Sequence, residues 1–322
     1  MTTARALIVQ PGVAGNFHCV SRCVRRAWLC GVDPLTKRDY SHRRDLIKQR
    51  LFALADIFAV GIHSFAVMSN HVHLVIRVEP ELTATWADQE VAERGVALHC
   101  PAKFTEIARQ NRIDAWRTDP ERLEELRIKL GSLSSFMQAL NQSIAIDANK
   151  EDGCTGKFWE GRYKCQRLED DSALLSAMAY VDLNPIRAGM ARDLPSSDHT
   201  SAQLRTNRIS ENRKIAGSRL KPVAGLCTRQ LLEMSESTYL QVVDWTGRRL
   251  HPDKTGKIAG DAPPILAAMG LTGRRWEGQV RGTESIYWRA IGSVDSLLDV
   301  TEQLGQRWLR GMRAVMALEK PG

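Results

Sequence analysis

Apolar residues recur at helical spacing in three stretches of the chain. A stripe with spacing i, i+4, i+7 and i+11 lies in residues 38–59, and Gly61 ends that pattern. A second stripe follows Gly131, and a third precedes Pro185, which closes or kinks a helix. Each pattern predicts one helix. The apolar positions are Ile47, Leu51, Leu54 and Phe58; then Leu133, Met137, Leu140 and Ile144; then Leu174, Met178 and Val181.

Four other stretches have the composition of strands. They are residues 16–24, 62–68, 71–78 and 156–168, and the turn-forming pair Ser69-Asn70 joins the second to the third. With the helices included, the order is strand, helix, strand, strand, helix, strand, helix. This order predicts an α+β fold with a ferredoxin-like antiparallel sheet and packed helices.

Three further regions lie outside this pattern. Residues 81–131 are polar and charged, and we expect a helical insertion there. Residues 196–225 are rich in Ser, Arg, Lys and Asn, which is typical of a linker. The chain therefore divides into a first domain at 1–195, a linker at 196–225 and a smaller, mostly helical accessory domain at 226–322.

Composition and charge narrow the class of protein. The 322 residues carry 45 Lys and Arg against 37 Asp and Glu, a net charge of +8 that permits an acidic partner such as nucleic acid. No apolar run reaches the ~18 residues of a membrane span, and the N-terminal apolar stretch is too short for a signal peptide. The seven cysteines form no CxxC pair, so reduced, mostly buried thiols are expected. We expect a cytoplasmic protein with no membrane partner.

Two histidines interrupt the apolar run "AVMSNHVHLVI". Side chains alternate along a strand, so His71 and His73 point to one face while Val72, Leu74 and Ile76 point to the other. Their backbones lie about 7 Å apart, close enough for both imidazoles to bind one metal ion. Two unrelated histidines with separate hydrogen bonds are the alternative, and the spacing alone leaves it open.

A tyrosine and an asparagine share one face of the third predicted helix. Tyr180 and Asn184 are four residues apart, and Tyr180 lies off the apolar stripe among small neighbours. We therefore expect Tyr180 in an uncrowded place. It could act as a nucleophile, or it could be a surface tyrosine packed on the next loop.

Aromatic and basic residues alternate in "FWEGRYK", and arginines cluster in "SRCVRR". Such surfaces can stack bases and neutralise phosphates, although ordinary solvated cations are the alternative in both places. The residues in question are Trp159, Arg162, Tyr163 and Lys164 in the first segment, and Arg22, Arg25 and Arg26 in the second.

Taken together, four motifs resemble one known family. "PGVAGNFHCVSR", "MSNHVHLVI", "GKFWEGRYK" and "AYVDLNPIRAG" occur in this order in REP-associated tyrosine transposases, which belong to the HUH single-tyrosine nucleases. The resemblance covers about residues 5–191. The insertion at 81–131 is longer than compact members carry, and the region after Ser196 lies outside the resemblance.

The resemblance implies a chemistry for these residues. His71 and His73 would bind Mg²⁺ or Mn²⁺ with Asn184 as third ligand, although imidazole pairs more often bind Zn, Cu, Fe or Ni. The ion would polarise the scissile phosphate, and Tyr180 would attack it to give a covalent 5′-phosphotyrosine and a free 3′-hydroxyl. Backbone contacts to DNA would come from the cations named above and from Arg187.

The implied substrate is single-stranded DNA with a hairpin, of the repetitive extragenic palindrome type. Related transposases include dimers, and the sequence leaves the oligomeric state open. Three alternatives stay open: a replication initiator or relaxase, a domesticated hairpin-binding regulator without transposition, and an RNA-binding protein with the same sheet. For the region after Ser196, the hypothesis is that cations beside Trp245 and Trp276 lie on loop tips and add DNA affinity.

Overall fold

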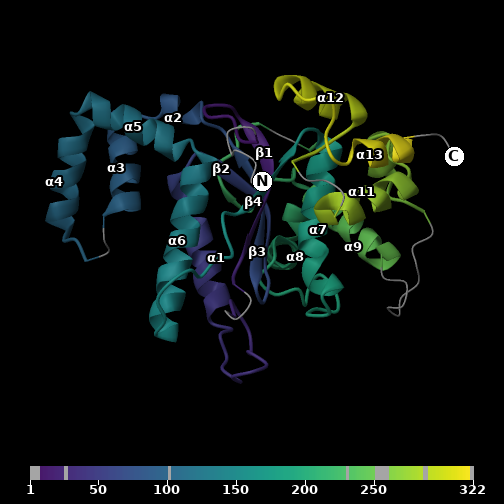
Figure 1. Ribbon diagram of the computed structural model, residues 1–322, viewed down its shortest axis with the longest axis horizontal. Coiled ribbons are helices and arrows are strands. Elements are labelled where there is room, and N and C mark those ends of the chain that lie inside the picture. The colour runs from purple at the N-terminus through teal and green to yellow at the C-terminus, as the bar shows by residue number, and fades with distance from the viewer. Residues whose placement is uncertain are drawn as a thin grey trace.

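A six-stranded sheet runs through the middle of the molecule (Figure 1). The computed structural model describes residues 8–24, 28–100, 103–229, 232–250, 261–285 and 289–319. The strand order is β5-β2-β3-β1-β4-β6, and every neighbouring pair is antiparallel except β4–β6. The strands are β1 (Gly15–Arg22), β2 (Val60–Val67), β3 (His71–Val78), β4 (Lys164–Leu168), β5 (Ala224–Gly225) and β6 (Ala290–Ile291).

The four central strands and two helices confirm the predicted α+β fold with its ferredoxin-like arrangement. Helix α1 (Arg43–Ile57) connects β1 to β2, and α6 (Leu133–Asp152) precedes β4. Both helices cover the same face of the sheet (Figure 1). Their apolar stripes bury Leu51 and Phe136 against Leu74 and Ile76, the β3 residues that alternate with the two histidines. The histidines therefore lie on the opposite face.

Helix α7 (Asp171–Arg187) covers that opposite face. The Asp170 side chain caps it by accepting a hydrogen bond from the Ala173 backbone N–H at 2.8 Å. Pro185 lies inside the last turn, and the helix continues to Arg187. Asp182 anchors α7 from its buried side: it accepts hydrogen bonds from the Tyr239 hydroxyl at 2.5 Å and from the Ala202 backbone N–H at 3.0 Å. The rotation of α7 about its axis is thereby fixed.

The predicted helical insertion lies at the left edge of Figure 1, away from α7. It has a small core of its own, which includes Trp86, Val91 and Leu126. The backbone N–H of Ala59 donates to the carbonyl of Leu130 at 2.9 Å and ties the end of the insertion to the sheet. Its helices are α2 (Leu82–Thr85), α3 (Asp88–His99), α4 (Glu106–Arg117) and α5 (Pro120–Leu130).

The prediction of a linker at 196–225 is wrong, because this segment forms regular secondary structure. It contains α8 (Ser201–Glu211), the short 3-10 helix η2 (Arg213–Gly217) and strand β5. After it come α9 (Glu236–Leu250), α10 (Pro264–Ala268), α11 (Gly273–Ser285), α12 (Val294–Gln303) and α13 (Met312–Glu319). Strands β5 and β6 extend the two edges of the sheet, and one apolar core runs from Val75 through α7 to Val315. The region predicted as an accessory domain therefore shares its core with the first.

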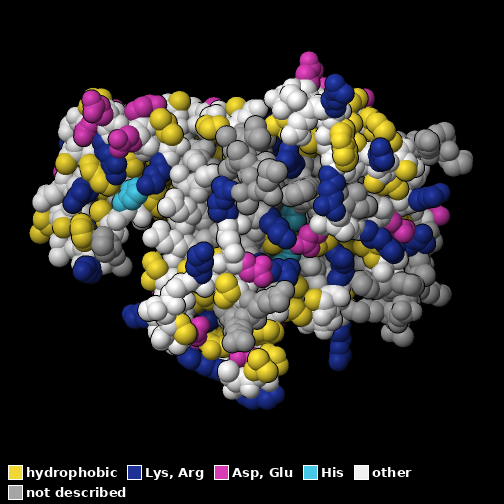
Figure 2. All heavy atoms as spheres, in the orientation of Figure 1, with side chains coloured by type: hydrophobic (Ala, Val, Ile, Leu, Met, Phe, Trp, Pro, Cys, Tyr) yellow, Lys and Arg dark blue, Asp and Glu magenta, His cyan; other side chains and the backbone are white. Residues whose placement is uncertain are grey.

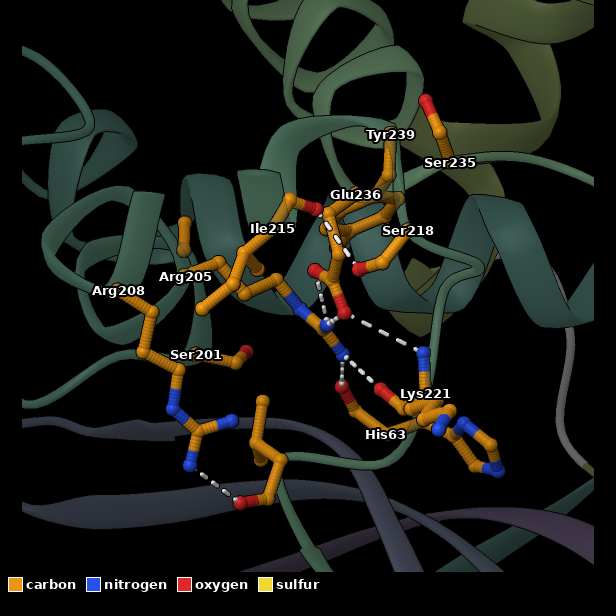
Figure 3. Close-up of polar contacts among 12 residues, drawn as sticks. His63, Ser201, Arg205, Arg208, Ile215, Ser218, Lys221, Ser235, Glu236 and Tyr239 are labelled. Atoms are coloured by element: carbon orange, nitrogen blue, oxygen red, sulfur yellow. Dashed lines mark hydrogen bonds and ion pairs between the residues drawn. The ribbon is translucent and has the colours of Figure 1, made fainter. Parts of the chain in front are cut away.

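A buried arginine joins the two regions (Figure 3). Arg205 on α8 is 1% exposed and pairs with the carboxylate of Glu236 at the start of α9, with an Nη1–Oε1 distance of 2.7 Å. Its Nη2 donates to the backbone carbonyls of His63 at 3.0 Å and Lys221 at 2.8 Å. One guanidinium thus ties α8 and α9 to strand β2. Its two terminal nitrogens are hydrogen-bonded and its charge is paired with Glu236, while its Nε has no hydrogen-bond partner among the described residues.

Two further local expectations fail. The strand expected from residue 156 begins at Lys164, and the residues before it form a loop in which Gly156 adopts a φ of +113°. In the C-terminal region, Trp245 lies within α9 and Trp276 within α11, and both are buried, so neither is free to stack on a base. Lys254 and Lys257, two of the cations expected on a loop tip near Trp245, lie outside the described residues. Within the described ranges, no helix is both long and apolar enough to cross a membrane.

Candidate active site

The two histidines of β3 lie together on the α7 face of the sheet. The ring centroids of His71 and His73 are 4.7 Å apart, with the planes nearly perpendicular. His73 is fully buried and His71 is half-buried. The Nδ1 of His71 lies 2.6 Å from Oδ1 of Asn70, which makes Nδ1 the protonated nitrogen and leaves Nε2 with its lone pair. The strand geometry thus brings the pair together as the alternation predicts.

Tyr180 lies against this pair. Its ring centroid is 5.8 Å from that of His73, in an edge-to-face arrangement. Asp182, two residues later, lies on nearly the opposite side of the helix, and its hydrogen bonds fix the rotation of α7 so that Tyr180 faces the histidines. The expectation of an uncrowded tyrosine is wrong: the side chain is 3% exposed. Its small neighbours on α7 let the sheet and α11 approach closely, so residues of these other elements enclose the ring.

The hydroxyl of Tyr180 donates a hydrogen bond to the carboxylate of Glu284 on α11. Burial, together with this hydrogen bond, raises the pKa of Tyr180 to about 12. Burial is the largest single influence on Glu284 and would raise its pKa, but the hydrogen bond from Tyr180 and the electrostatic interactions with His18, His71 and Arg22 together lower that pKa. The pair is therefore a neutral phenol beside an ionised carboxylate.

A third histidine, which the motifs did not single out, completes the group. His18 on β1 is 1% exposed, and its ring is stacked on that of His73 with centroids 5.3 Å apart. It also makes an edge contact with Tyr180 at 5.9 Å. A histidine inside the apolar strand "NFHCV" was the available signal. Glu284 gave no signal, because only tertiary packing brings α11 to the site.

Burial keeps the imidazoles neutral. Loss of solvent lowers the pKa of His71 to about 4, lowers that of His73 well below its usual value, and lowers that of His18. Nearby cationic groups, including Arg22, lower the pKa values of His71 and His73 further. Neutral imidazole is the form that binds metal ions.

Asn184 lies one turn from Tyr180, as expected. Its amide nitrogen donates to the backbone carbonyl of Tyr180 at 3.4 Å. Among the residues that the structure describes, no three His, Cys, Asp or Glu side chains are grouped so as to hold a metal ion. A divalent ion held by His71 and His73 therefore needs oxygen ligands from elsewhere, such as the Asn184 amide or a phosphate.

Three of the predicted basic residues surround the site. Arg22 is the direct cross-strand neighbour of His71, and Lys164 begins β4 beside β1. The guanidinium of Arg187 lies 4.8 Å from the centroid of the Tyr180 ring. Figure 2 shows Lys and Arg side chains around the centre of the viewed face, where histidine is visible between them. Three cationic side chains thus lie around the candidate nucleophile, whose hydroxyl itself faces the Glu284 carboxylate.

The other residues predicted to contact DNA are not at the site: some are bonded to or packed on other parts of the protein. The Nε1 of Trp159 donates to the carbonyl of Asn141 at 2.8 Å, and its ring packs edge-to-face on Phe158. Tyr163 lies near the Ser134 hydroxyl, and Arg162 is exposed in the loop before β4. Arg25 and Arg26 lie outside the described residues.

Comparison with known proteins gives one distant similarity. No family model matches the chain, and a search of curated protein sequences finds no significant match. Among solved structures, the chain is similar to one described as "Structure of the REP associates tyrosine transposase bound to a REP hairpin". The identity is 11% and the TM-score 0.38, and the match covers 71% of this chain and 99% of that one. At this distance the similarity carries no conclusion about activity.

Proposed function

We propose that the protein is a metal-assisted, DNA-nicking and strand-transfer enzyme of the single-tyrosine HUH type. The observation that carries the proposal is the contact of the Tyr180 ring with His73, which puts a hydroxyl nucleophile beside a pair of neutral imidazoles. The motif order in the sequence and the basic residues around the site support it. A divalent ion bound by His71 and His73, with oxygen from Asn184, would polarise the scissile phosphate.

The chain's own groups account for the rest of the reaction. The Tyr180 oxygen forms a bond to phosphorus, and the bond from phosphorus to the 3′-oxygen breaks. The products are a 5′-phosphotyrosine and a 3′-hydroxyl. The phenol proton leaves towards the acceptor that it already faces, the Glu284 carboxylate, and the leaving 3′-oxygen takes up a proton from solvent. Arg22 and Arg187 neutralise phosphate charge beside the reacting atoms.

The substrate class in this proposal is single-stranded DNA with a hairpin. Tyr180 is buried, so the DNA backbone must bend into the site to reach it. A single strand can do this more easily than a duplex. Single strands also bind through phosphate contacts, which exposed cations such as Arg162 and Lys164 can make.

The test is incubation with end-labelled hairpin DNA carrying single-stranded flanks, with Mg²⁺ or Mn²⁺, followed by a denaturing gel. We expect a covalent adduct that chelator abolishes. Tyr180→Phe should lose the adduct while hairpin affinity stays within about twofold, because only the hydroxyl is removed. Tyr163→Phe is the matched control and should keep it.

Three results would contradict the proposal. If Tyr180→Phe still forms the adduct and Tyr163→Phe does not, the nucleophile is Tyr163 rather than Tyr180. Equal cleavage with and without chelator would show that the reaction needs no metal ion. Tight hairpin binding without any cleavage would leave a DNA-binding regulator.

A further inference from the structure

A row of hydrogen bonds crosses three adjacent strands beneath α7. It begins at the backbone of α11, passes through Gln166 on β4 and His18 on β1, and ends at His73 on β3. The sheet register creates this row. Gln166 is the direct cross-strand partner of His18, and His73 lies diagonally across the next strand pair on the same face. All three side chains are at most 7% exposed.

The hydrogen bond between Gln166 and Thr283 determines which atom is the donor in each of the other two hydrogen bonds of the row. The Gln166 amide nitrogen donates to the backbone carbonyl of Thr283 at 2.9 Å. Its Oε1 therefore faces His18, because the reverse orientation would bring two carbonyl oxygens together. Oε1 lies 2.8 Å from Nδ1 of His18, so Nδ1 carries the proton and donates.

The order of donors then continues to His73. With Nδ1 protonated and the ring neutral, Nε2 of His18 can only accept. It lies 3.1 Å from Nδ1 of His73, so that nitrogen must be the donor. The proton of His73 is thus fixed on Nδ1, and Nε2 keeps its lone pair. This Nε2 is buried and has no hydrogen-bond partner among the described residues.

A buried acceptor without a partner destabilises the folded protein unless another group satisfies it. A cation satisfies it best, because the lone pair of neutral imidazole is the atom that binds metal ions. Metal-binding histidines commonly donate their other ring N–H to an acceptor that fixes the tautomer, and in this site the acceptor is a second imidazole.

We propose that His18 and Gln166 are positioning residues that hold His73 in the Nδ1–H tautomer, with Nε2 ready to bind a divalent cation. The row of hydrogen bonds starts at the Thr283 carbonyl on α11. Helix α11 therefore determines which ring nitrogen of His73, on β3, carries the proton. This inference rests on the proposed metal role of His73, and it adds two residues and a direction of proton donation to it.

The first test needs no metal and no DNA. Long-range ¹H–¹⁵N correlation spectra of the metal-free protein, labelled with ¹⁵N at histidine, report which ring nitrogen carries the proton. Assignment uses the spectra of His18→Phe and His73→Phe. We expect both His18 and His73 to be protonated at Nδ1. An Nε2–H tautomer at either residue overturns the relay whatever the enzyme does.

The second test measures Mn²⁺ affinity by electron paramagnetic resonance or calorimetry, without substrate. Gln166→Met removes the acceptor for His18 at similar volume, and we expect Mn²⁺ to bind about 10–100-fold more weakly. Gln279→Met is the matched control, because Gln279 is 5% exposed on α11 and donates to the Ser172 hydroxyl rather than to a histidine. Its affinity should stay within twofold of the original protein.

The outcomes separate the two proposals. If the original protein binds Mn²⁺ and Gln166→Met binds it equally well, the relay is wrong and the proposed function stands. If the original protein binds no Mn²⁺, the metal role of His73 is wrong, and with it the proposed purpose of the relay, whatever tautomers the spectra show. If both glutamine variants lose affinity equally, the loss reflects packing of α11, and the relay is again wrong.

Discussion

Tyr180 and Glu284 are 104 residues apart in sequence, and the hydroxyl of one donates to the carboxylate of the other. Through this contact the C-terminal region reaches the candidate nucleophile. The carboxylate holds the proton on the phenol in the resting protein, because its negative charge disfavours a phenolate beside it. The same carboxylate orients the hydroxyl.

Replacing Glu284 with glutamine should lower the phenol pKa. Burial is the first cause of the rise to about 12 and would remain, whereas the contribution of the carboxylate would be lost. The pKa should therefore move from about 12 towards the ordinary value of about 10. The measurement is the ¹³Cζ shift of labelled tyrosine between pH 9 and 11, with Tyr180→Phe for assignment. Glu277→Gln, on the same helix but paired with Arg249, should leave the titration unchanged. An equal shift in both variants would contradict this reading.

The proposed metal ligands should differ in how much metal-dependent activity is lost when each is removed. His73→Ala removes a buried imidazole whose lone pair has no other use, so metal-dependent adduct formation should fall below detection. Asn184→Ala should reduce it less, about 10-fold, because water can replace one amide oxygen. The rate of adduct formation at increasing Mn²⁺ concentration gives the comparison. Full activity in His73→Ala, or a larger loss in Asn184→Ala, would contradict the ligand assignment.

Acid should destabilise the fold through His63, which lies away from the candidate site. Burial, reinforced by Arg205 and Arg77, lowers the pKa of His63 to about 3. Between pH 6.5 and pH 3 the unfolded chain binds a proton at this residue and the folded chain does not, so the free energy of unfolding falls as pH falls. From pH 6.5 to pH 4 the loss is on the order of 3 kcal/mol. Urea unfolding of the original protein and of His63→Gln should differ in slope with pH, the variant being flatter. Parallel slopes would contradict the assignment.

A chain ending at residue 195 should not fold cooperatively. It would lose α8, α9 and α11, and expose the α7 side of the core that Tyr239, Trp276 and Val280 now cover. Asp182 would also lose the Tyr239 hydroxyl and remain buried with fewer donors, or become exposed. Circular dichroism melts and size-exclusion chromatography would check this. A soluble truncated chain with a sharp melting transition would restore the accessory domain that the sequence predicted.

The sequence predicts this fold where local patterns decide it. The alternation in β3 places Leu74 and Ile76 on one face and His71 and His73 on the other, as the structure confirms. Prediction from the sequence fails where the groups around a residue belong to segments far away in the chain. Tyr180 looked open because its helical neighbours are small, but those small residues let other elements approach. The many Ser, Arg and Lys residues in 196–225 are typical of a linker. Arg205 is nevertheless buried and paired with Glu236, 31 residues later, and no local pattern reveals that partner.

Strand β1 is translated before β3 and β4, the two strands that flank it in the sheet, so it cannot pair until they have been made. His18 needs His73 from β3 and then Gln166 from β4, and Gln166 in turn needs the Thr283 carbonyl. Domains generally fold as units during synthesis, from the N-terminus onward. In this chain the histidine row and the tyrosine can be assembled only after α11 has been translated. A nascent chain, or a fragment that ends before α11, therefore lacks the assembled candidate site, and Tyr180 gains its partner Glu284 only once α11 is present.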